Sequence, residues 1–173
     1  MCIDEAGFYL LAAAVRSYAP KGQTPILRIP LTHDHLSVIS AVTPTGKLYV
    51  HLQEQAFKGE SIVQFLQALL EQMTGKLLII WDGLAAHRGE AVKAFLRAGA
   101  AQRIHLERLP PYAPDLNPTE GIGQYLKYVE MKNVCCHSLA ELRFELRQAI
   151  TRLRHKGSII PACFDRIHFG QIL

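Results

Sequence analysis

The 173-residue sequence lacks any apolar stretch near the roughly 20 residues that a membrane-spanning helix needs. The apolar run over residues 7–15 follows Asp4 and Glu5, where a signal peptide carries positive charge. Internal repeats and low-complexity stretches are also absent, and 49% of the residues are hydrophobic. We therefore expect one globular domain over residues 1–173, in the cytoplasm and with no membrane partner.

Cysteine is scarce, and its spacing excludes the usual cysteine-based sites. The four cysteines are Cys2, Cys135, Cys136 and Cys163, and no C-x-x-C pair occurs. Residues 135–137, Cys-Cys-His, lack the paired spacing of a closed zinc site, so we expect reduced thiols. Charge is also limited: a net +4 permits binding to nucleic acid without requiring it.

The hydrophobic pattern predicts strands that alternate with helices. A short strand over residues 1–5 stops at two acids and is followed by a hairpin over residues 36–52. Helices are expected over residues 60–73 and 90–98, each followed by a strand, at 76–81 and 103–109. This order predicts an α/β fold with a mixed sheet.

Proline excludes regular structure over residues 110–118 and then marks the start of a helix. Pro118 suits the first helical position, with Asn117 as the N-cap. The last predicted helix begins at Ser138, which forms an S-x-x-E capping box with Glu141.

Three acidic residues stand where ligands collect in such folds. Asp4 and Asp82 each end a predicted strand, and Glu120 lies in the first turn of the helix that begins at Pro118. Hard carboxylate oxygens suit Mg²⁺, and clustered carboxylates repel one another unless cations lie between them. Taken singly, the three residues fit bland roles better: Asp4 a solvated strand end, Asp82 a turn, and Glu120 a partner of the helix dipole.

Three segments carry a resemblance to a known family. Residues 3–8, IDEAGF, resemble its D-E-S-G-F segment, and residues 81–88, WDGLAAHR, resemble its D-x-x-x-x-H block. Residues 109–120, LPPYAPDLNPTE, resemble its long L-P-x-Y-(S/A)-P-x-L-N-P-x-E block, and 37 residues lie between Asp82 and Glu120. The sequence is therefore similar to the DDE transposases of the Tc/mariner superfamily, in the bacterial insertion-sequence six-thirty branch.

The resemblance implies a ribonuclease-H-like core that cleaves DNA strands and transfers them during transposition. It makes Asp4, Asp82 and Glu120 the catalytic, metal-binding residues, with two Mg²⁺ or Mn²⁺ ions. The implied partners are transposon-end and target DNA, at the nucleoid. The implied assembly is a homodimer or a complex with a transposase chain that carries a helix-turn-helix.

Three further residues are candidates for supporting roles, each with an alternative. His87 contacts DNA or the metal shell, or makes a structural hydrogen bond. Asn117 is a helix cap or a substrate contact, and Lys127 binds a phosphate or is simply solvated. The arginine-rich face of the last helix lies on DNA or in solvent.

The sequence departs from the family pattern in three ways. No helix-turn-helix precedes Asp4, and the first strand is expected to be truncated, which would loosen that residue. Gly121 and Gly123 are expected to weaken the helix that presents Glu120. These departures leave open an alternative function, that of an inactive fragment that acts as an oligomerisation or DNA-binding module.

Overall fold

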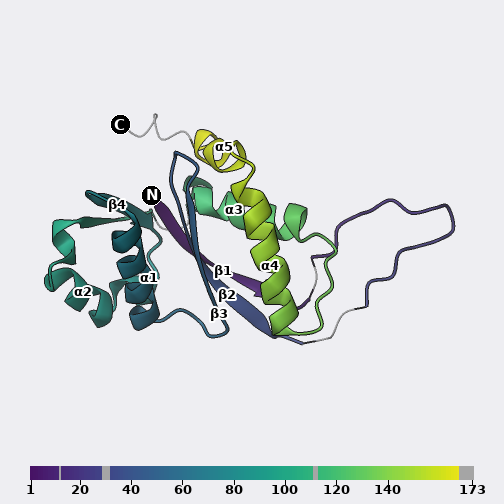
Figure 1. Cartoon of the computed structure of the whole chain (residues 1–173), viewed down its shortest axis with the longest axis horizontal. Helices are drawn as coiled ribbons and strands as arrows, with labels where there is room; N and C mark the ends of the chain where they lie inside the picture. The colour runs from purple at the N-terminus through teal and green to yellow at the C-terminus, as the bar shows by residue number, and fades with distance from the viewer. Residues whose placement is uncertain (12, 29–31, 111–112, 168–173) are drawn as a thin grey trace.

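A five-stranded mixed sheet forms the centre of the computed structural model, which describes residues 1–11, 13–28, 32–110 and 113–167 (Figure 1). Its strands are β1 (Cys2–Tyr9), β2 (His35–Val42), β3 (Leu48–Gln53), β4 (Leu77–Trp81) and β5 (Ile104–Arg108). Their order is β3-β2-β1-β4-β5. β1, β2 and β3 pair antiparallel, whereas β4 lies parallel to β1 and β5 parallel to β4. The predicted mixed α/β sheet is confirmed.

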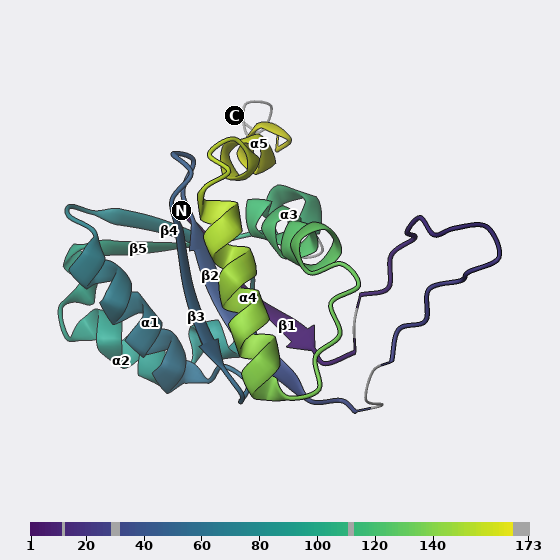
Figure 2. The same cartoon turned by 45° about the vertical axis from the view of Figure 1, so that its right-hand side comes forward.

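Helices cover both faces of the sheet (Figure 2). One face packs against α1 (Gly59–Gln72) and α2 (Glu90–Arg97). The other face packs against α3 (Pro118–Tyr125), α4 (Leu139–Arg154) and α5 (Ile159–Asp165). Each layer has its own apolar core, because side chains alternate between the two faces of a strand. Among the described helices, none is long and apolar enough to cross a membrane.

The first strand is longer than the sequence predicts. It pairs with β2 from Cys2, opposite Val42, to Tyr9, opposite His35, so the prediction that it stops at the two acids is wrong. Asp4 therefore lies within an eight-residue strand. The ladder that β1 forms with β2 holds its backbone in place along this length.

The helix that follows the proline-rich segment begins as predicted. The Asn117 side chain accepts a hydrogen bond from the Thr119 backbone at 3.1 Å, and Pro118 opens α3. Gly121 has a packing role, because a Cβ at this position would lie 3.1 Å from the Cys163 sulfur in α5. The glycine thus permits the close approach of these two helices. A π-helical turn, Leu126–Glu130, continues α3.

The longest helix, α4, also follows its predicted pattern. Ser138 caps it by accepting a hydrogen bond from the Glu141 backbone, while the Glu141 carboxylate accepts one from the backbone of His137. Its buried face consists of the five residues expected from helical spacing, which are Leu142, Leu146, Ala149, Ile150 and Leu153. The short helix α5 was not predicted, since seven residues carry too little periodicity.

The connection between β1 and β2 extends away from the sheet and helices in both views (Figures 1 and 2). Asn133 holds its beginning: its side chain accepts a hydrogen bond from the Val15 backbone at 2.8 Å, and its N–H donates to Ala13. The connection leaves on the side of α3 and α4, away from α1 and α2. The loop predicted for residues 17–24 is confirmed.

Candidate metal centre

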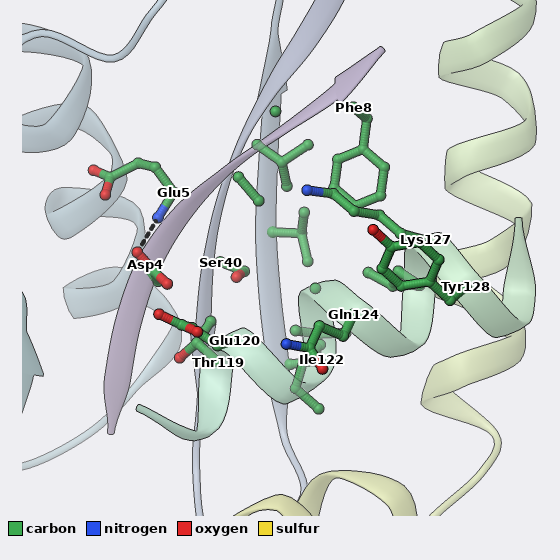
Figure 3. Close-up of a pocket in the computed structure, with 17 residues that line it drawn as sticks. Asp4, Glu5, Phe8, Ser40, Thr119, Glu120, Ile122, Gln124, Lys127 and Tyr128 are labelled. Carbon is green, nitrogen blue, oxygen red and sulfur yellow. Dashed lines mark hydrogen bonds between the residues drawn. The ribbon is translucent and has the colours of Figure 1, made fainter. Parts of the chain in front are cut away.

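One cavity gathers the three acids that the sequence singled out. Its volume is about 560 Å³, and Asp4, Asp82 and Glu120 all line it. Asp4 comes from the central strand β1, Asp82 directly follows the neighbouring strand β4, and Glu120 is the third residue of α3. Figure 3 shows Asp4 and Glu120 side by side, while Glu5 points to the other side of β1.

The Asp4 carboxylate is held in a defined orientation. Oδ1 accepts a hydrogen bond from the Glu5 backbone at 2.9 Å, and Oδ2 accepts one from the Asn117 side chain at 3.1 Å. Burial raises the pKa of Asp4 to about 7, against the hydrogen bond from Glu5, which lowers it. The nearby carboxylates of Glu5, Asp82 and Glu120 raise it further. The electrostatic environment of Asp4 therefore favours either a proton or a cation.

Asn117 has two roles. Its oxygen caps α3 and its amide donates to Asp4, so one buried side chain fixes the start of the helix relative to β1. Because Glu120 lies in the first turn of that helix, the cap also determines where Glu120 stands. The sequence predicted the cap but not the bond to Asp4.

His87 is buried, with 3% of its surface exposed, and lies between two acids. Its Nε2 is 2.8 Å from Glu5 Oε1, and its Nδ1 is 2.8 Å from Asp82 Oδ1. Its ring stacks on Trp81 with 4.3 Å between ring centroids. Burial alone would lower the pKa of His87, but the contacts with Glu5 and Asp82 outweigh it and raise the pKa. The buried hydrogen bond that the sequence offered as one alternative is formed with Glu5.

Lys127 lies over the Phe8 ring, with Nζ 5.3 Å from the ring centroid. It lines a second cavity, of about 450 Å³, which Asp4 and Glu120 also line (Figure 3). Lys127 thus lines a cavity that shares Asp4 and Glu120 with the cavity of Asp82, and it lies on the same side of β1 as Asp4.

Arg108 is a site residue that the sequence did not single out. It ends β5 and lines the cavity with the three acids. A Cβ on Gly83 would overlap its guanidinium, so the glycine after Asp82 leaves room for this cation. Among the described residues, Arg108 makes no ion pair. Its position directly before the proline-rich segment 109–120 is the feature of the sequence that could have identified it.

Two arginines of α4 contact the sheet. Arg143 donates to the Leu52 carbonyl and to the Glu54 carboxylate, and Arg154 donates to the Leu48 carbonyl. These bonds attach α4 to β3. Arg154 is nevertheless exposed, so these contacts leave both alternatives for the arginine-rich face, DNA and solvent, open.

The donor set suits a hard divalent cation. The cavity presents three carboxylates and an amide, and oxygen ligands of this kind are those that Mg²⁺ and Mn²⁺ prefer. Within the described ranges, no three His, Cys, Asp or Glu side chains already surround one point as ligands do. The carboxylates thus share a cavity without converging on one point, and burial, with a smaller contribution from the neighbouring carboxylates, raises the pKa of Asp4. The residues fit the cation by the chemistry of their donors and by the cavity that they share.

Comparison with known proteins identifies the family. Residues 1–143 match the family described as DDE superfamily endonuclease, and the chain belongs to this family. No curated protein matches the chain.

Solved structures share the fold. The Mos1 strand transfer complex matches with a TM-score of 0.63 and 16% identity, over 93% of this chain and 53% of that one. The Mos1 mariner paired end complex with Mn has the same score and identity, over 95% and 53%. The catalytic domain of Mos1 mariner transposase matches with a TM-score of 0.56 and 12% identity, over 93% and 79%.

These matches confirm the predicted ribonuclease-H-like fold and the predicted membership of the DDE endonuclease superfamily. The chain spans about half the length of the Mos1 chains in the two complexes.

Proposed function

We propose that this chain performs metal-dependent cleavage and joining of DNA strands, as the catalytic domain of an insertion-sequence transposase of the six-thirty branch. One observation carries the proposal: in a member of the DDE endonuclease family, Asp4, Asp82 and Glu120 line one cavity. The similarity to Mos1 structures described as strand transfer and paired end complexes supports DNA as the substrate. DNA brought together as two ends also favours a homodimer, or a complex with a chain that supplies a helix-turn-helix.

In this proposal Asp4, Asp82 and Glu120 hold two Mg²⁺ or Mn²⁺ ions. When bound, the ions supply an activated water and neutralise charge on the leaving oxygen of a phosphodiester. Mos1 structures with Mn and with Mg support this choice of metals. Asn117 orients the Asp4 carboxylate through one hydrogen bond and caps the start of α3 through another. Because α3 carries Glu120, this cap positions Glu120 beside Asp4.

Cations around the cavity bind the DNA backbone. Arg108 reaches the cavity from β5, and Lys127 reaches the adjoining one from the turn after α3. Phosphate contacts of this kind position DNA without reading its sequence.

The test is cleavage of a plasmid that carries the sequences flanking the gene, with Mg²⁺ or Mn²⁺. The wild-type chain should cleave and join this DNA, and Asp82→Asn should lose at least 100-fold in rate while it still binds DNA. Asp165→Asn, an exposed aspartate in α5, is the matched control. Equal activity in wild type and Asp82→Asn would contradict the proposed metal site. Inactivity of the wild type with intact DNA binding would favour the inactive oligomerisation or DNA-binding module.

A further inference from the structure

The strands that carry Asp4 and Asp82 are joined by few backbone contacts near the cavity. The described ladder between β1 and β4 contains the pair Cys2 and Ile80, and the Ile80 N–H donates to the Met1 carbonyl. Beyond this point β1 continues along β2, whereas β4 ends at Trp81. The described ladder between the two strands has thus ended before the level of the two aspartates.

A side-chain bridge spans this gap on the α1–α2 face of the sheet. Glu5 Oε1 lies 2.8 Å from His87 Nε2. On its other side, His87 Nδ1 lies 2.8 Å from Asp82 Oδ1 and 3.4 Å from the Asp82 carbonyl oxygen. Glu5 follows Asp4 directly, so the bridge connects the immediate neighbour of one aspartate to the other aspartate.

The imidazole at the centre of the bridge is fixed from several directions. Its ring lies parallel to Trp81, with an interplanar angle of 1°, and its backbone N–H donates to Leu84 in a tight turn. The Leu84 N–H in turn donates to Asp82 Oδ1 at 3.0 Å. The second Glu5 oxygen, Oε2, is buried without a hydrogen-bond partner in the described structure, so His87 provides the contact that orients Glu5.

We propose that Glu5 and His87 are positioning residues, which set the spacing of Asp4 and Asp82 and the orientation of the Asp82 carboxylate for a divalent cation. The inference rests on the proposed function. Residues that hydrogen-bond to metal ligands orient them, and mutations there usually cost 10–100-fold in metal affinity.

Two simpler accounts make different predictions. If His87 only fills space against Trp81, a ring of similar size at this position leaves metal affinity unchanged. If the bridge acts only through charge, loss of the imidazole leaves more negative charge near the cation, and metal affinity rises. The positioning account alone predicts that metal affinity falls although the cationic group has been removed.

The experiment measures Mn²⁺ affinity by electron paramagnetic resonance and calorimetry, with urea unfolding in chelator as a second readout. His87→Phe keeps the stacked ring and removes both contacts, and we expect affinity to fall 10–100-fold. Glu5→Gln keeps an acceptor oxygen for His87 and should stay within about threefold of the wild type, whereas Glu5→Met should weaken binding about tenfold or more. Glu71→Gln, on the exposed side of α1, is the control.

The outcomes separate the bridge from the proposed function. Unchanged or tighter Mn²⁺ binding by His87→Phe would overturn the bridge, while loss of binding in Asp82→Asn would leave the metal site standing. If His87→Phe does not fold, the two Glu5 variants decide, because equal weakening by Gln and Met would indicate charge alone. A wild-type chain that binds no Mn²⁺ would overturn both proposals.

Discussion

Asparagine at position 4 should change how the stability of the metal-free protein depends on pH. The folded protein holds the pKa of Asp4 at about 7, above its ordinary value of 3.8. At pH values between these two pKa values, the folded chain keeps a proton on Asp4 that the unfolded chain has lost. The free energy of unfolding therefore falls as pH rises. Each pH unit in this range lowers the free energy of unfolding by about 1.4 kcal/mol. The two units from pH 5 to pH 7 therefore lower it by about 3 kcal/mol.

Asp4→Asn removes this loss because the amide carries no charge at any pH. The oxygen of the new amide can still accept the hydrogen bond from the Glu5 backbone. The hydrogen bond from the Asn117 side chain to the second carboxylate oxygen is lost, at a cost of about 1 kcal/mol of unfolding free energy. In chelator, we therefore expect the variant to gain about 3 kcal/mol relative to the wild type between pH 5 and pH 8. Groups that titrate in both chains, such as His87, cancel in this difference.

The assay is urea unfolding of both chains at several pH values, with and without Mn²⁺. A cation favours the charged carboxylate, so Mn²⁺ should restore the wild type at pH 8 and leave the variant almost unchanged. Two stability curves that stay parallel from pH 5 to pH 8 would contradict the raised pKa, because Asp4 would then titrate near its ordinary value.

Three further changes test separate parts of the site. Asn117→Ala removes the α3 cap and the donor to Asp4, and should cost about 1–2 kcal/mol of unfolding free energy in urea, whereas a loss below about 0.3 kcal/mol would contradict the dual role. Lys127→Ala should reduce the salt dependence of DNA binding by about one counterion, measured by fluorescence anisotropy, and an unchanged slope would remove it from the interface. Gly83→Ala should displace the flexible Arg108 side chain, weaken DNA binding several-fold in the same assay, and cost less than about 1 kcal/mol of stability; unchanged binding would argue against Arg108 as a phosphate contact.

Local sequence signals predicted much of the fold. The hairpin, the helices α1, α2 and α4, and the start of α3 each depend on nearby residues, such as Asn117 before Pro118. The length of β1 could not be predicted in this way, because residues 6–9 form a strand only through pairing with β2. In that segment, long-range hydrogen bonds outweigh a weak local preference.

The site was predictable to the extent that motifs mark it. The segments around Asp82 and Glu120 identified two acids, and Asp4 followed from its neighbours and the resemblance. The contact between Glu5 and His87 joins residues 82 positions apart, which no local pattern encodes. Arg108 was missed for a related reason, since its role depends on the approach of β5 to the turn after Asp82.

In the function that we propose, three carboxylates of this chain hold divalent cations. The most direct test is the number of Mn²⁺ ions bound per chain, measured by calorimetry and electron paramagnetic resonance for the wild type, Asp4→Asn, Asp82→Asn and Glu120→Gln. The account predicts two ions for the wild type and fewer ions, or at least tenfold weaker binding, for each variant. Equal stoichiometry and affinity in all four proteins would contradict it.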